Sequence, residues 1–174
     1  RLLRARRRVE WDWLPLATAL LALLMVLNAW WRFYRGDSTE AWTVAEFFPV
    51  MILLIILFLI NAAALPDRVP PEGIDLRAFY ESNSSYFWLL FSVFMFVLIF
   101  RVISAQVSSY PAEGISEWKE FAKLFTFHLP NLTLAVLFAC LARYRNRTFH
   151  VVSVIGALLV LGFFFARLSI GGPQ

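Results

Sequence analysis

The sequence predicts an all-α, polytopic transmembrane helical bundle. Of its 174 residues 60% are hydrophobic and only 16% are charged, whereas a soluble domain is about half apolar and about a quarter charged. Five separate segments approach the roughly 20 apolar residues that a helix needs to cross a bilayer core. The alternating segments of about ten residues that are typical of membrane β-barrels do not occur in the sequence. We therefore expect residues 1–174 to form a single transmembrane helical domain.

The five expected spans follow one another through short connections. They cover residues 14–31, 47–65, 86–105, 121–142 and 149–168. A basic stretch before the first span imitates the start of a signal peptide, but the apolar run of about 18 residues is longer than a signal's and lacks a small-residue cleavage site. We expect this first span to be retained. If one further span precedes Arg1, the full protein has six.

The distribution of Lys and Arg predicts the orientation, because cytoplasmic loops carry an excess of both. Five Arg precede the first span, Arg68 and Arg77 lie in the second connection, and three Arg lie in the fourth. These ten cations fall on one face and the other six on the opposite face. We therefore expect the basic N-terminal segment and the Arg143–Arg147 loop to be cytoplasmic, with the C-terminus outside.

Polar side chains inside the expected spans indicate where a function would lie, since each needs a partner or water. Six of them fall at similar depth in the outer half: Asn28, Arg32, Glu46, Arg101, His128 and Asn131. One interpretation is a polar cavity that opens outward and binds a small molecule, an ion or a lipid head group, with Glu46 paired to Arg101. The other is that Arg32 and Arg101 reach the membrane surface and Asn131 bonds a neighbouring helix.

The fourth connection contains Arg143, Arg145 and Arg147 and no acid. Such a loop usually sets topology, and it can also hold the anionic head groups of membrane lipids. Membrane lipids are therefore one expected partner.

No catalytic residue, cofactor or metal site is expected. His128 and His150 are separated by roughly 20 Å along the membrane normal, so they cannot both ligate one haem, and a helix-packing role for His128 is favoured over ligation of a pigment. Cys140 has no second thiol for zinc or an iron–sulfur cluster. The phosphate-binding, dinucleotide-binding, metalloprotease and serine-hydrolase motifs are missing, and nothing supports binding of nucleic acid.

Several short motifs resemble those of a family of uncharacterised small polytopic bacterial inner-membrane proteins. They are the run from Arg6 to Trp13, Asn28-Ala29-Trp30-Trp31, Leu65-Pro66-Asp67-Arg68 and Gly73-Ile74-Asp75-Leu76. The resemblance implies a location in the bacterial inner membrane and a further hydrophobic segment upstream. It implies no activity and no catalytic residues.

The leading functional expectation is a non-enzymatic accessory or structural subunit that packs against other membrane proteins or against copies of itself. The alternative is a small transporter or channel that uses the outer polar cavity. A third possibility is a lipid-acting membrane enzyme with Glu46 or His128 as its base, which requires both side chains to reach one bound lipid.

Overall fold

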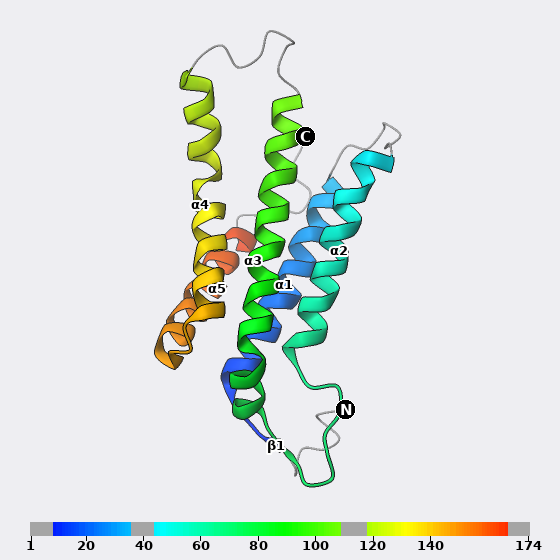
Figure 1. The fold of residues 1–174 in the computed structure, drawn as a ribbon, viewed down its shortest axis with the longest axis vertical. Coiled ribbons are helices and arrows are strands. Elements are labelled where there is room, and N and C mark those ends of the chain that lie inside the picture. The colour runs from blue at the N-terminus through cyan, green and yellow to red at the C-terminus, as the bar shows by residue number, and fades with distance from the viewer. Residues whose placement is uncertain (1–8, 36–43, 109–117, 167–174) are drawn as a thin grey trace. The chain divides into compact units, whose positions relative to one another are not determined.

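The computed structural model describes residues 9–35, 44–108 and 118–166, and this part of the chain is mostly helical (Figure 1). The helices are α1 (Trp13–Arg35), α2 (Val44–Ala64), α3 (Leu76–Ser108), α4 (Trp118–Arg143) and α5 (Arg147–Ala166). Two strands of two residues each, β1 (Val9–Glu10) and β2 (Ile74–Asp75), complete the described elements. The prediction of a helical protein is confirmed, and the short strand pair is an addition to it.

Three of the described helices contain a stretch long and apolar enough to cross a membrane. These stretches are Trp13–Trp31, Phe47–Ala64 and Leu76–Ser104. The residues predicted for the fourth and fifth spans are helical as well, up to Ala166. The basic segment before Val9 and the end of the fifth predicted span lie outside the described residues.

Helices α1, α3 and α5 each begin at an Asx residue whose side chain caps the first turn. The Leu14 N–H donates to Asp12 Oδ1 at 2.9 Å, and the Arg77 N–H donates to Asp75 Oδ1 at 2.7 Å. Asn146 Oδ1 accepts from the N–H groups of Thr148 and Phe149. Because the first N–H groups of a helix have no partner within the helix, these caps fix where each helix starts.

A turn before β2 allows the two strands to pair. The Gly73 N–H donates to the Pro70 carbonyl at 3.0 Å, and Gly73 has a positive φ of 103°, which side chains other than glycine rarely tolerate. The strands run parallel with Val9 opposite Ile74 and Glu10 opposite Asp75. This pairing connects the residues just before α1 to the residues just before α3.

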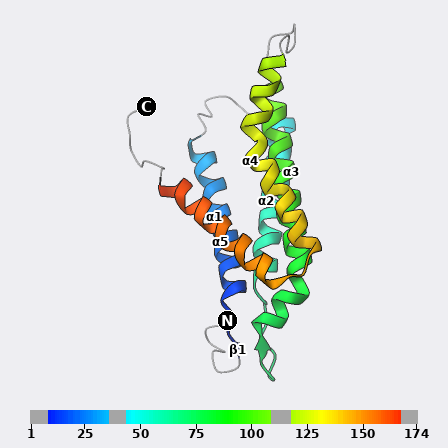
Figure 2. The same ribbon diagram turned by 90° about the vertical axis from the view of Figure 1, so that its left-hand side faces the viewer.

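The chain divides into two compact units. The first contains β1, α1, the end of α2, β2, α3 as far as Asn83, and α5. Within it, α5 packs across α1 (Figure 2). The buried residues recur at helical spacing and several are small, which permits close approach: Leu14, Thr18, Leu21 and Ala22 on α1, and His150, Ser153, Val154 and Ala157 on α5.

The second unit contains α2 as far as Ile60, α3 from Ser84, and α4. Its core is aromatic: the rings of Trp88 and Phe138 stack with centroids 5.4 Å apart, and Phe91 lies 5.2 Å from Phe138. Next to them the Ser92 hydroxyl donates to the Ala135 carbonyl at 3.0 Å. These contacts hold α3 against α4. The boundary between the two units falls within α2 and within α3. That residues 1–174 form a single transmembrane domain stays a prediction.

Candidate functional site

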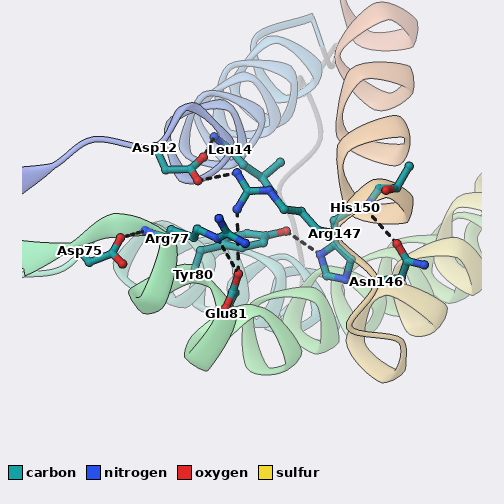
Figure 3. A network of polar contacts seen from close by, with 10 residues as sticks. Asp12, Leu14, Asp75, Arg77, Tyr80, Glu81, Asn146, Arg147 and His150 are labelled. Atoms are coloured by element: carbon teal, nitrogen blue, oxygen red, sulfur yellow. Dashed lines mark hydrogen bonds and ion pairs between the residues drawn. The ribbon is translucent and has the colours of Figure 1, made fainter.

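A network of polar contacts lies where α1, α3 and α5 begin (Figure 3). We call it the helix-start network. It consists of Asp12, Arg77, Tyr80, Glu81, Arg147 and His150. All six belong to the first unit, so their mutual geometry is that of one compact body.

An ion pair between Asp12 and Arg147 joins the starts of α1 and α5. Arg147 Nη2 donates to Asp12 Oδ2 at 2.6 Å, while the other carboxylate oxygen accepts the N–H of Leu14. The Asp12 side chain is 9% exposed and that of Arg147 is 38% exposed. Both oxygens of a shielded carboxylate are therefore satisfied, one by a cap and one by a cation.

The pKa of Asp12 reflects a balance between burial and these partners. Burial by itself raises the pKa of the carboxyl group. The hydrogen bonds from Leu14 and Arg147, together with the charges of Arg147 and Arg77, outweigh burial and lower the pKa below its ordinary value of 3.8. Asp12 is therefore a carboxylate at neutral pH, and the ion pair is fully charged.

Helix α3 contributes a second, more exposed ion pair. Arg77 Nε donates to Glu81 Oε1 at 3.0 Å, one turn along the helix, and both side chains are 58% exposed. Glu81 Oε1 also lies 3.9 Å from Arg147 Nη1. Arg147 thus lies between Asp12, the cap of α1, and Glu81 of α3, as Figure 3 shows.

Tyr80 of α3 and His150 of α5 add a buried contact to the network. A hydrogen bond of 2.7 Å joins the Tyr80 hydroxyl and His150 Nδ1, and the rings meet edge to face with centroids 5.7 Å apart. The two residues are 8% and 2% exposed. In the tautomer with its proton on Nε2, Nδ1 accepts from the phenol, and in the tautomer with its proton on Nδ1, the imidazole donates to the phenol oxygen.

The contacts of the helix-start network join helices to one another and leave its polar groups engaged within the protein. Its acids and guanidinium groups neutralise one another, and a substrate would have to displace Tyr80 to reach His150 Nδ1. Among the described residues there is no group of three or more His, Cys, Asp or Glu side chains placed to hold a metal ion. The network therefore ties three helix starts together.

The residues predicted for the outer polar cavity are divided between the two units. Asn28 belongs to the first unit, whereas Arg101, His128 and Asn131 belong to the second. His128 is buried, and the other three are partly exposed. Arg32 and Glu46 lie on α1 and α2, but their side chains lie outside the described part of the structure. Convergence of these residues on one cavity stays a prediction.

The three arginines of the fourth connection have different surroundings. Arg143 and Arg145 are exposed at the end of α4 and just before α5. Arg147 is instead engaged by Asp12 and Glu81. Contact with lipid head groups stays a prediction for all three, and a lipid would have to share Arg147 with these two acids.

Sequence reasoning did not identify the helix-start network, although part of its signal is visible. Asp12 and Asp75 stand directly before an apolar residue, and Asn146 stands three residues before Phe149, close to the position that N-caps prefer. The pairing of these helix starts has no local signal, because Asp12 and Arg147 are 135 residues apart.

The chain matches no model of a known protein family, no curated protein and no solved structure.

Proposed function

We propose that the protein is a multi-pass membrane protein with a structural role, an accessory subunit that packs against other membrane proteins or against copies of itself. The observation that carries the proposal is the contrast between its two kinds of surface. The polar side chains of the helix-start network bind one another, while large apolar side chains lie exposed along α1, α2, α3 and α5. A surface of this kind is stable only against lipid or against another apolar helix.

The lengths of the helices support five spans. Helices α4 and α5 have 26 and 20 residues, which correspond to about 39 Å and about 30 Å at the rise of an α-helix. Both lengths suffice for a hydrocarbon core of about 30 Å. Together with the three apolar stretches of α1, α2 and α3, they favour a five-span bundle.

The distribution of basic residues supports an orientation with the N-terminal segment and the Arg143–Arg147 loop in the cytoplasm. The helix starts of α1, α3 and α5 then lie on the cytoplasmic side. The resemblance to bacterial inner-membrane proteins supports that membrane as the location. In this proposal the protein has no enzymatic chemistry of its own.

Purification in native lipid, followed by mass spectrometry of what remains bound, tests the proposal. We expect a stoichiometric protein partner, either another membrane protein or a second copy. Recovery of a lone chain with a bound small molecule would overturn the subunit role and favour a transporter. In that case Glu46→Gln and His128→Ala should release the molecule, whereas His150→Ala, which removes the other histidine, should not.

A further inference from the structure

We propose that Arg145 binds the phosphate group of an anionic phospholipid at the membrane surface. Arg145 is exposed, stands just before α5 and belongs to the first unit. The inference rests on the proposed membrane location. It goes beyond the structural role by naming a lipid partner, and it separates Arg145 from Arg147, which the sequence alone does not distinguish.

The positive charge of Arg145 is not neutralised within the part of the chain that the structure describes. Arg77 and Arg147, the other arginines at these helix starts, each bind a carboxylate. No ion pair or side-chain hydrogen bond among the described residues involves Arg145. Its guanidinium group is therefore available to an anion from outside the chain.

The caps of the helices explain part of this difference. Helices α1 and α3 are capped by the carboxylates of Asp12 and Asp75, and each of these also attracts a guanidinium group. Helix α5 is capped by the neutral amide of Asn146. The residue that follows Arg145 thus fixes the start of α5 without placing a negative charge beside it.

The helices of the second unit do not supply the missing acid. Their acidic residues are Glu46 and Glu120. Glu120 lies in the first turn of α4 and Arg145 follows the last turn, so nearly the whole helix of 26 residues, about 35 Å, lies between them. Glu46 lies in the first turn of α2, whereas the last turn of α2 belongs to the first unit. The turns of α2 and α4 that adjoin the first unit therefore carry no carboxylate.

Exposed tryptophans mark the level of this region in the membrane. Trp11 and Trp13 are 43% and 48% exposed and stand on either side of Asp12. Tryptophan is enriched where a bilayer meets water, with its ring at the level of the lipid head groups. Asp12 is bound to Arg147 at 2.6 Å, and Arg145 is only two residues from Arg147, which is at most about 7 Å of chain. Arg145 therefore lies at head-group level as well.

The anion that a membrane provides at this level is the phosphate of a phospholipid. A guanidinium group donates two parallel hydrogen bonds to a phosphate, which an ammonium group does not reproduce. An arginine close to an anionic membrane surface strengthens binding about fivefold. Arg147 is less suited to this role because Asp12 binds it and Glu81 lies within 3.9 Å of it.

Lipid titration of the purified full chain tests the proposal. The chain is held in a neutral detergent, short-chain phosphatidylglycerol is added, and the bound lipid is counted by native mass spectrometry. We expect Arg145→Gln to weaken phosphatidylglycerol binding about fivefold and Arg145→Lys to have an intermediate effect. Arg77→Gln is the matched control, because it removes an arginine of the same unit that Glu81 already binds. It should change binding less than about twofold, and zwitterionic phosphatidylcholine should bind the parent and all variants alike.

Three outcomes would overturn the lipid site. They are equal phosphatidylglycerol binding by the parent and Arg145→Gln, an equal loss in Arg77→Gln, and displacement of the lipid by inorganic phosphate at the same concentration, which would identify a site for a soluble anion. If any of these occurs while a protein partner still co-purifies, the structural role stands without the lipid site. A chain that alkaline carbonate extracts from membranes would refute the membrane location and both proposals with it.

Discussion

Asp12 has two roles in the helix-start network, an ion pair with Arg147 and a cap for α1. Variants that separate these two roles test what the network contributes to stability. Asp12→Asn removes the negative charge and keeps an oxygen for the Leu14 N–H, since asparagine caps helices as well as aspartate does. Arg147→Gln removes the cation. The two single variants and the double variant form a cycle that isolates the pairwise interaction.

The expected coupling free energy between Asp12 and Arg147 lies between the values for a buried ion pair and for a surface ion pair. A hydrogen bond between charged groups contributes about 1.5–3 kcal/mol when it is shielded, but Arg147 is 38% exposed, and solvent weakens its attraction to Asp12. We therefore expect a coupling free energy of about 1 kcal/mol for this pair. Asp12→Ala should lose about 1 kcal/mol more than Asp12→Asn, because it also removes the cap.

The assay is equilibrium unfolding of the purified protein in mixed micelles with increasing SDS, followed by circular dichroism. A matched cycle on Arg77 and Glu81 serves as the control. Both of these side chains are 58% exposed and lie one turn apart on α3, so their coupling should be only about 0.3–0.5 kcal/mol. Additive single variants at Asp12 and Arg147, or a coupling no larger than the control's, would refute the attachment role.

The coupling should also depend on pH in a defined direction. The pKa of Asp12 is lower in the folded protein than its ordinary value of 3.8, so the unfolded chain binds the proton more tightly. The stabilisation is therefore complete above this ordinary pKa and is lost as the pH falls through the folded pKa. Repeating the cycle between pH 7 and pH 3 should show a constant coupling that declines only at the acid end. A decline already at pH 6 would contradict the assignment to Asp12.

Three further variants test other contacts by the same unfolding assay. Tyr80→Phe should lower the free energy of unfolding by about 1 kcal/mol, because buried His150 Nδ1 loses its hydrogen bond to the Tyr80 hydroxyl. An unchanged free energy of unfolding would show that this bond is dispensable. Trp88→Ala should cost about 2 kcal/mol, mainly through the cavity left in the aromatic core, whereas its exposed neighbour Leu89→Ala should cost far less. Ser92→Ala should cost about 0.6 kcal/mol through its bond between helices, and a loss above 2 kcal/mol would indicate a larger role.

The positions of the helices could be predicted because hydrophobic length is a local property. The predicted spans 14–31, 86–105 and 121–142 fall within α1, α3 and α4. Span 47–65 ends one residue beyond α2, and span 149–168 agrees with α5 as far as Ala166, the last residue that the structure describes there. The span predicted for residues 86–105 differs most, because α3 begins ten residues earlier at Leu76. The residues from Leu76 onward form the first turns of α3, since Asp75 caps a helix whose Leu76 and Tyr80 are buried.

The contacts between helices could not be predicted, because they depend on which faces meet. Arg147 has the same local sequence features as Arg143 and Arg145, and the sequence makes all three equal candidates for contact with lipid head groups. Only the packing of α5 across α1 distinguishes Arg147, by placing it against Asp12. Likewise His150 gave no sign in the sequence of its bond to Tyr80, which is 70 residues away.

The long separation between Asp12 and Arg147 imposes an order on biosynthesis. At about 5–20 residues per second, a ribosome needs about 7 to 27 s to add the 135 residues between them. During that time the Asp12 carboxylate has its cap but lacks its cation. A truncated product that ends before α5 lacks this partner permanently. The closed ion pair therefore distinguishes a chain that includes α5 from one that ends before it.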